Sequence, residues 1–237
     1  MYYCINLPRR RDRWRRMIRR FRALDMTVER FSAIDGYAIN VDEVSPQLLA
    51  LQYDSTANAA WDPLVSPGIM CRLTPGEVGC TLSHIAVWDE LLSRRERYAI
   101  VLEDDVDMSS RFPAFANEVV ERLRAWDLIY FGYQTVAGDP AFHSSKELAR
   151  PRYLFGTYAY AISRSGAERI MSLLPVVGPL DVFLSTNFRR LSVWCTTSPL
   201  VNFQPRSMRD SDVVHSAHTD ARRELRGALA RINNQER

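Results

Sequence analysis

The sequence has 237 residues, of which 46% are hydrophobic and 25% are charged, and its formal net charge is +3. This composition is typical of a globular chain with a substantial core, and it excludes a disordered or fibrous protein. The sequence contains no run of about 18 apolar residues, which excludes a membrane-spanning helix. The start, MYYCINLPRR, lacks the charged and long apolar regions of a signal peptide, so we expect a cytoplasmic protein.

The N-terminal part predicts a β-α-β unit. The apolar run Tyr2–Leu7 predicts a strand, and Val28–Gly36 predicts a second strand that ends in an Asp-Gly turn. Between them, apolar residues at helical spacing predict an amphipathic helix whose other faces carry arginine; the apolar residues are Trp14, Met17, Ile18, Phe21 and Leu24. Residues 37–74 lose this periodicity and contain three prolines, which predicts a loop or a small helical insertion.

The middle of the chain predicts a long helix followed by a buried strand. Thr74 is a suitable N-cap, Pro75 suits the first helical position, and Glu77 completes a capping box. We expect the buried face of this helix to be formed by Leu82, Ile85, Trp88, Leu91 and Leu92. A strand ending at residue 102, a helix over 112–124 and a strand over 127–133 follow.

The last third repeats this alternation. A polar hairpin or loop over 134–150 precedes a strand over 153–163, helices over 163–175 and within GPLDVFLSTNFRR, and a strand within LSVWCTTSPLVNF. The alternation predicts one α/β domain over residues 1–219 with a mostly parallel sheet flanked by helices, followed by a charged tail over 220–237. The cysteines are too scattered for a zinc motif or a disulfide framework, so we expect free thiols at Cys4, Cys71, Cys80 and Cys195.

An acidic run follows the buried strand Ala99–Leu102. Glu103, Asp104 and Asp105 come directly after it, and Asp107 lies two residues further on. Clustered carboxylates raise the cost of one another's ionisation, so this run needs an explanation. A bound cation, a solvated turn and a helix cap each provide one. In a parallel α/β sheet the ligands bind at the carboxyl ends of the strands, where this run lies, and Mg²⁺ or Mn²⁺ prefers such oxygen ligands.

Three weaker signals accompany the acidic run. His84 follows Glu77 by seven residues, so both side chains can face the same side of the predicted helix, although a lone helical histidine is more often structural. Gly156-Thr157 permits a close backbone approach to a ligand, or marks a bulge. The segment QPRSMRDSDVVHS is either a surface loop or a segment that closes on a phosphate, and its polar residues are Arg206, Arg209, Asp212 and His215.

The segment Arg9–Arg22 holds nine arginines and one aspartate. Nucleic-acid binding would need aromatic residues on the basic face, but Trp14 and Phe21 belong to the apolar stripe. Attraction to an anionic membrane surface, at about 1 kcal/mol per basic residue, is one remaining interpretation. A solvated helix face is the other.

Taken together, these motifs resemble glycosyltransferase family 25. The matching order is INLPRRRDRW, AIDG, TPGEVGCTLSH, IVLEDD, DLIYFG, GTYAYAISRSGAERI, PLDVFL and SPLVNFQ, over roughly residues 2–215. The resemblance implies a GT-A fold, whose Rossmann-like part binds a nucleotide sugar and whose DxD-type motif holds a divalent metal. Glu103 and Asp105 match the outer carboxylates of that motif, and Asp104 lies between them.

The resemblance also implies an activity: transfer of a sugar, with galactose as the first expectation, from a UDP-sugar to a lipooligosaccharide, lipopolysaccharide or related glycan. Mn²⁺ or Mg²⁺ would bind Glu103 and Asp105, and Asp212 or His215 is a further candidate ligand. The donor would contact Asn6, Leu7, Arg9, Asp35, Gly36, Glu103, Asp104, Gly156 and Thr157. The resemblance implies inversion, which requires a general base on the acceptor hydroxyl. Asp181 is the first candidate for this base, and His84 and Glu77 are the second.

Two other functions share these features. A nucleotidyl- or phosphotransferase uses the same carboxylates and metal, although the sequence contains no glycine-rich phosphate loop. A non-catalytic glycan- or membrane-binding relative is the other alternative. A lipid-linked acceptor would give the arginine-rich helix a use at the inner face of the membrane. Residues 37–74 match no block of the family, so the acceptor contacts stay unassigned.

Overall fold

The computed structural model describes residues 1–62, 65–135, 143–144, 146–204, 211–214 and 216. Within these residues the central sheet has the strand order β2-β1-β6-β11-β8-β13-β10-β9. Its strands are β1 (Tyr2–Asn6), β2 (Glu29–Ser32), β6 (Tyr98–Glu103), β8 (Leu128–Gln134), β9 (His143–Ser144), β10 (Leu148–Arg150), β11 (Phe155–Ser163) and β13 (Val193–Thr196).

Most strands of this sheet run in one direction. β1 pairs in parallel with β2 and β6, and β13 pairs in parallel with β8. β11 lies antiparallel between β6 and β8, and β10 is antiparallel to both β13 and β9. Tracing these pairings, β11 and β10 run against the other six strands. The expected single α/β domain with a mostly parallel sheet is confirmed.

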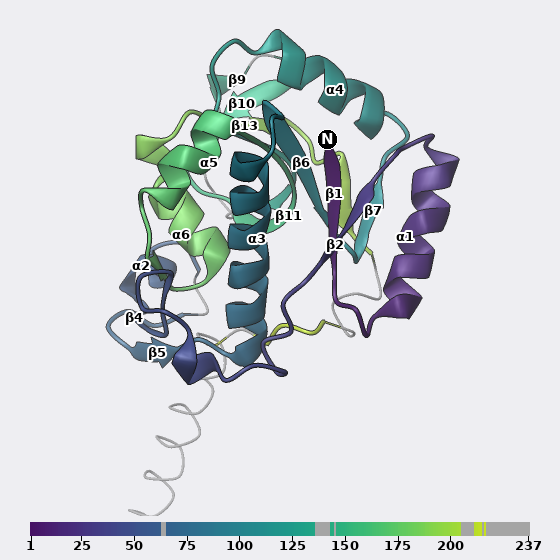
Figure 1. Cartoon of the computed structure of the whole chain (residues 1–237). Coiled ribbons are helices and arrows are strands. Elements are labelled where there is room, and N and C mark those ends of the chain that lie inside the picture. The colour runs from purple at the N-terminus through teal and green to yellow at the C-terminus, as the bar shows by residue number, and fades with distance from the viewer. Residues whose placement is uncertain (63–64, 136–142, 145, 205–210, 215, 217–237) are drawn as a thin grey trace, which may run out of the picture.

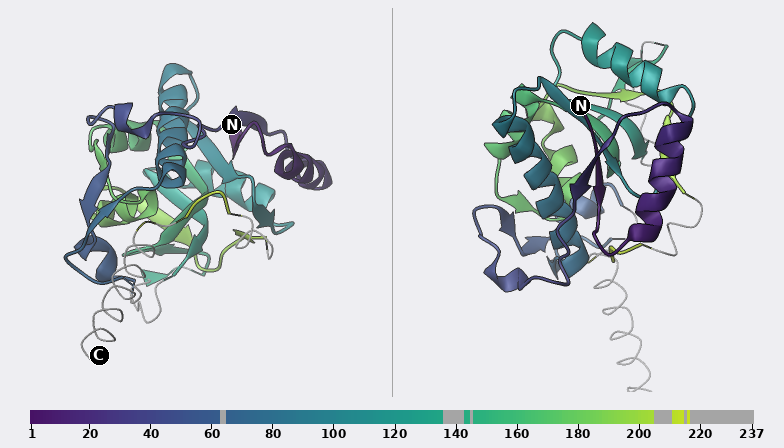
Figure 2. Two further views of the ribbon diagram at one scale, coloured as in Figure 1. Left: turned by 90° about the horizontal axis from the view of Figure 1, so that it is seen from below. Right: turned by 45° about the vertical axis from the view of Figure 1, so that its right-hand side comes forward.

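Helices cover both faces of the sheet (Figures 1 and 2). α3 (Pro75–Ser93), α5 (Arg164–Met171) and α6 (Leu180–Thr186) pack on one face, and α1 (Arg11–Ala23) and α4 (Phe112–Arg122) pack on the other. Side chains of β6 alternate between these two cores: Val101 belongs to the first, and Ile100 and Leu102 belong to the second. Because both faces of β6 are buried, its sequence is a continuous apolar run.

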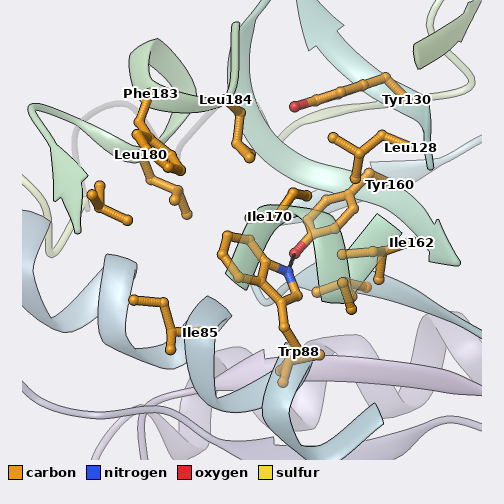
Figure 3. Packing of buried hydrophobic residues seen from close by; sticks show 14 of the residues in the cluster. Ile85, Trp88, Leu128, Tyr130, Tyr160, Ile162, Ile170, Leu180, Phe183 and Leu184 are labelled. Carbon is orange, nitrogen blue, oxygen red and sulfur yellow. Dashed lines mark hydrogen bonds between the residues drawn. The ribbon is translucent and has the colours of Figure 1, made fainter. Parts of the chain in front are cut away.

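α3 is buried around most of its surface. Thr74 caps it and Glu77 completes the capping box, as the sequence predicts. Trp88 is fully buried and donates a hydrogen bond from its indole nitrogen to the hydroxyl of Tyr160 on β11, at 2.9 Å (Figure 3). This bond ties the middle of α3 to the central strand of the sheet.

α1 differs from its prediction at one residue. Met17 and Phe21 are buried, as the apolar stripe predicts, but Arg13 is also buried, with 5% of its surface exposed. Arg13 precedes Met17 by four residues and therefore lies on the same side of the helix. The expectation that the arginines occupy only the other faces is wrong at this position.

The remaining elements are short. Within residues 37–74 lie η1 (Val41–Glu43), β3 (Leu49–Ala50), β4 (Gln52–Asp54), α2 (Thr56–Ala59) and β5 (Met70–Arg72). β4 pairs with β5, and β3 pairs with β12 (Val176–Val177). The single strand predicted within LSVWCTTSPLVNF is two strands, β13 and β14 (Val201–Phe203). β14 does not join the central sheet but pairs with β7 (Val106–Met108). η2 (Phe188–Arg190) precedes β13. The predicted tail, 220–237, lies outside the described residues, within which no helix is long and apolar enough to cross a bilayer.

Two glycines let α3 touch the loop after β2. A Cβ atom added at Gly79 would lie 2.6 Å from both the carbonyl oxygen of Ile34 and the backbone nitrogen of Gly36. Real Cβ atoms do not approach backbone atoms this closely, so the contact requires glycine at position 79. It also fixes the distance between α3 and the loop.

We expect Gly79→Ala to lower the free energy of unfolding by about 2 kcal/mol, despite the better helix propensity of alanine, because the added methyl group pushes α3 away from the loop. Urea denaturation measures this change. Asp89→Ala, on the exposed side of the same helix, should change stability by less than about 0.5 kcal/mol. Equal stability of Gly79→Ala and the wild type would show that the contact can relax without cost.

Candidate active site

A cleft lies at the edge of the sheet where β1, β2 and β6 end, with a cavity volume of about 200 Å³. Because β11 runs against these strands, its start reaches the same edge and brings Gly156 and Thr157 to the cleft. The first turns of α3 and α6 and residues 211–213 complete the wall. The strand ends therefore gather at one edge, where α/β proteins bind their ligands.

The acidic run forms a buried turn in this cleft. Asp104 and Asp105 are only 6% and 9% exposed. They lie between β6 and β7, and the next helix, α4, begins only at residue 112. A solvated turn and a helix cap are therefore both excluded for these two residues. Asp107 is separate, because its side chain is half exposed and forms an ion pair with Arg20.

Arg13 provides the positive charge next to these carboxylates. Its guanidinium donates to Asp104 at 2.8 Å and to Asp105 at 3.3 Å. The side-chain amide of Asn6 donates to the other oxygen of Asp104 at 2.5 Å. Burial still raises the pKa of Asp104, with Arg13 acting against it. One oxygen of Asp104 is thus paired with Arg13 and the other with Asn6.

Asp105 is less well compensated. Burial, followed by repulsion from Glu103, raises the pKa of Asp105 to about 7. Its Oδ1 atom is buried and has no hydrogen-bond partner among the described residues. A buried carboxylate oxygen without a donor is costly, and a divalent cation is a partner that would satisfy it. Asp105 together with Glu103 therefore fits the oxygen donor set of Mg²⁺ or Mn²⁺.

Glu103 links the acidic turn to α3 and β11. Its Oε1 atom accepts a hydrogen bond from the hydroxyl of Thr157 at 3.1 Å and lies 3.6 Å from Nε2 of His84. The other ring nitrogen of His84, Nδ1, lies 2.8 Å from the hydroxyl of Tyr160, which also accepts from Trp88. The imidazole is therefore held in place on one side and faces the cleft with the other.

Arginines of the β1–α1 region hold residue 212 across the cleft. The carboxylate of Asp212 accepts from Arg9 at 2.7 Å and from Arg10 at 2.6 Å. Arg9 also donates to Asp35 at 2.6 Å, which lowers the pKa of that carboxyl. The cleft thus carries guanidinium groups at its mouth and carboxylates inside.

The three candidate bases have different surroundings. Asp181 accepts from the backbone N–H of Gly156 and from that of Val182, both at 2.9 Å. Glu77 accepts from Thr74 through one oxygen and from Ser216 through the other, so it joins the start of α3 to the chain near residue 216. His84 is 1% exposed. Of the three, Asp181 is the one that is hydrogen-bonded to Gly156, a predicted contact of the nucleotide sugar.

The cleft gathers nearly all the predicted site residues. Those that line it are Leu7, Arg9, Asp35, Gly36, Glu77, His84, Glu103, Asp104, Asp105, Gly156, Thr157, Asp181 and Asp212. Asn6 lies behind the acidic turn, where it contacts Asp104, and His215 lies outside the described residues. Sequence reasoning missed Arg10, Arg13 and Cys80, although the four-residue spacing of Arg13 and Met17 was a readable signal for one of them.

The raised pKa of Asp105 has a consequence for stability. The folded protein holds this proton more tightly than the unfolded chain, whose aspartate pKa is near 3.9. The contribution to the free energy of unfolding is therefore fully present below about pH 4 and is lost as the pH rises to about 7.

Asp105→Asn mimics the protonated form. In metal-free buffer at pH 8 it should raise the free energy of unfolding by roughly 2 to 4 kcal/mol, and at pH 4.5 by about 1 kcal/mol or less. Urea denaturation at the two pH values measures this difference. Asp107→Asn, outside the cleft, serves as the control, and an equal effect of Asp105→Asn at both pH values would contradict the assigned titration.

Known proteins resemble this chain in sequence. The family profile described as "Glycosyltransferase family 25 (LPS biosynthesis protein)" matches residues 1–184. The chain is 32% identical over 197 residues to procollagen galactosyltransferase 2 of Homo sapiens, and 30% identical over 202 residues to the same-named protein of Mus musculus. It is also 30% identical over 197 residues to the inactive glycosyltransferase 25 family member 3 of Homo sapiens.

These matches cover 78–79% of this chain and 30–31% of the relatives, so the chain spans about a third of their length. The profile match covers more than half of the chain, and its residues include the acidic turn, the first turns of α3 and Asp181. The chain belongs to glycosyltransferase family 25.

Proposed function

We propose that this chain transfers a sugar, with galactose as the first candidate, from a UDP-sugar to a hydroxyl group of a lipooligosaccharide, lipopolysaccharide or related glycan. The observation that carries the proposal is the buried Oδ1 atom of Asp105 beside Glu103 in the cleft, for which the described residues offer no hydrogen-bond donor. This donor set suits Mn²⁺ or Mg²⁺, which bind through a few carboxylates together with substrate phosphates. Family membership supports the reaction class.

The bound cation would neutralise the diphosphate that leaves in glycosyl transfer. Around it, the chain's own residues would set the geometry. Arg13 and Asn6 fix Asp104 and so keep the acidic turn in shape. Asp35 and Gly36, beside Arg9, would line the base and ribose pocket.

Asp181 is our first candidate for the base that removes the proton from the acceptor hydroxyl, and His84 and Glu77 are second. The two oxygens of Asp181 accept from the backbone N–H groups of Val182 and Gly156, at the wall of the cleft. One oxygen of Glu77 accepts from the backbone N–H of Thr74 in the capping box, and the other accepts from that of Ser216. Protonation of Glu77 would disturb the start of α3, whereas protonation of Asp181 would disturb contacts within the cleft wall alone.

We also propose that the enzyme acts at the inner face of a membrane. Arginines on the exposed side of α1 would bring the enzyme to the anionic inner face of a membrane, where a lipid-linked acceptor lies. Arg11 and Arg15 are exposed on this helix. The cytoplasm would supply the nucleotide sugar.

A non-catalytic role is the second candidate, because a relative whose name calls it inactive is 30% identical to this chain, the same identity as procollagen galactosyltransferase 2 of Mus musculus. Turnover separates the two. Release of free UDP from a panel of UDP- and GDP-sugars, in the presence of Mn²⁺ or EDTA, would identify a donor. Metal-dependent UDP binding with no release from any sugar would favour the non-catalytic role.

Metal-dependent donor binding should depend on Asp105. In Asp105→Asn, calorimetric titration should show UDP binding in the presence of Mn²⁺ weakened at least tenfold, to the level of the wild type in EDTA, because the neutral amide is a poor ligand for a hard cation. Asp107→Asn is the matched control, since it removes a carboxylate from the same run but outside the cleft, and should bind like the wild type. Unchanged binding in Asp105→Asn would refute the metal assignment.

Asp181→Asn tests the base. We expect kcat to fall about 10²–10⁴-fold, as is typical for loss of a general base, while Mn²⁺-dependent UDP binding changes little. The asparagine oxygen can still accept one of the two backbone N–H bonds, so Gly156 should stay in position. Full turnover in this variant would move the assignment to His84, which His84→Gln examines in the same assay.

A further inference from the structure

One group of side chains in the cleft differs from the hard oxygen ligands described above. Cys80 and His84 lie one turn apart on α3 and face Glu103 at the end of β6. One ligand atom of each residue, a sulfur, a nitrogen and an oxygen, lies within 4.8 Å of the other two. Residues four apart on a helix share a face, so this arrangement follows from the local structure.

A second observation concerns the Nε2 atom of His84, on the cleft side of the imidazole. The imidazole is 1% exposed, and its Nε2 atom has no hydrogen-bond partner among the residues described by the structure. The other nitrogen, Nδ1, contacts the hydroxyl of Tyr160. The tyrosine oxygen has two lone pairs and can accept from both Trp88 and Nδ1–H. In that tautomer Nε2 has a free lone pair, and a metal-binding histidine usually donates a hydrogen bond from its other ring nitrogen.

We propose that Cys80, His84 and Glu103 form a zinc site with three protein ligands and a fourth position open to the cleft. A thiolate, an imidazole and a carboxylate are the three ligand types that zinc uses, whereas Mg²⁺ and Mn²⁺ avoid sulfur. On binding, a zinc–sulfur bond forms and the thiol proton passes to solvent.

The separations are close to those of a tetrahedral ion. Bond lengths near 2.1 Å place nitrogen and oxygen ligands about 3.4 Å apart, and Nε2 of His84 lies 3.6 Å from Oε1 of Glu103. Sulfur and nitrogen ligands of zinc should be about 3.6 Å apart. The sulfur of Cys80 lies within 4.8 Å of the other two ligand atoms, so it has to move closer by at most about 1.2 Å. Thr157, which donates to the same oxygen of Glu103, orients that ligand from the second side.

The site shares Glu103 with the proposed donor site. If the proposed function is correct, zinc at Cys80 and His84 competes with the ion that binds the nucleotide for the negative charge of Glu103. Zinc should then weaken Mn²⁺-dependent UDP binding. The zinc site itself does not depend on that function, because two of its three ligands take no part in donor binding.

Cobalt titration tests the site. The full chain is stripped with a chelator and titrated with Co²⁺, which replaces zinc and gives a near-ultraviolet thiolate-to-cobalt band when cysteine is a ligand. We expect one equivalent of Co²⁺ to produce this band and Zn²⁺ to remove it. Cys80→Ser should lose the band, and Cys195→Ser, which changes a buried thiol in β13, should keep it. No band in the wild type, or an undiminished band in Cys80→Ser, would overturn the proposal.

A second measurement uses the wild type alone and so does not depend on a variant that folds. Zn²⁺ should slow alkylation of Cys80 by iodoacetamide at least about tenfold, measured by mass spectrometry of its peptide, and Mn²⁺ should not. Equal rates with and without Zn²⁺ would count against the site. Asp105→Asn separates the two proposals, since it should keep the cobalt band whether or not it loses Mn²⁺-dependent UDP binding.

Discussion

The ion pair between Arg13 and the buried turn after β6 connects the two halves of the architecture. The turn places Asp104 and Asp105 beside Glu103 with little access to solvent, and buried carboxylates need a positive partner. Arg13 comes from α1, which packs on one face of the sheet, and reaches the edge where β6 ends. The pair therefore fixes the start of α1 relative to the cleft. It also leaves an excess of negative charge, so repulsion from Glu103 adds to the effect of burial in raising the pKa of Asp105.

The opposite wall depends on backbone contact instead of charge. Gly79 allows α3 to touch the loop at Ile34 and Gly36, so the first turns of α3 face the acidic turn across a narrow gap. Asp212 then closes the mouth by accepting from Arg9 and Arg10. The carboxylate of Asp212 sits where those guanidinium groups would otherwise meet an anion, so a diphosphate in the cleft would have Asp212 as its competitor for Arg9 and Arg10.

The sequence predicted those features that depend on local patterns. The apolar run of β6, the capping box at Thr74 and the alternation of strands and helices rest on neighbouring residues, and the structure has all three. The spacing of Arg13 and Met17 indicates that Arg13 lies on the buried side of α1, but its partners could not be predicted, because they are 91 and 92 positions away. The contact of Asp181 with Gly156 and the departure of β14 from the sheet are likewise set by tertiary packing.

Glu103 is the residue at which these constraints meet. On one side of it lies Asp105, an oxygen donor suited to a hard cation, and on the other lie His84 and Cys80, which suit a softer one. The carboxylate accepts a hydrogen bond from Thr157 and lies 3.6 Å from Nε2 of His84, so it is close to α3. Both proposed metal sites would draw on the one carboxylate of Glu103, so a zinc ion at Cys80 and His84 would weaken the binding of a second cation beside Asp105. The geometry of Glu103, more than that of any aspartate, would then decide which metal the cleft holds.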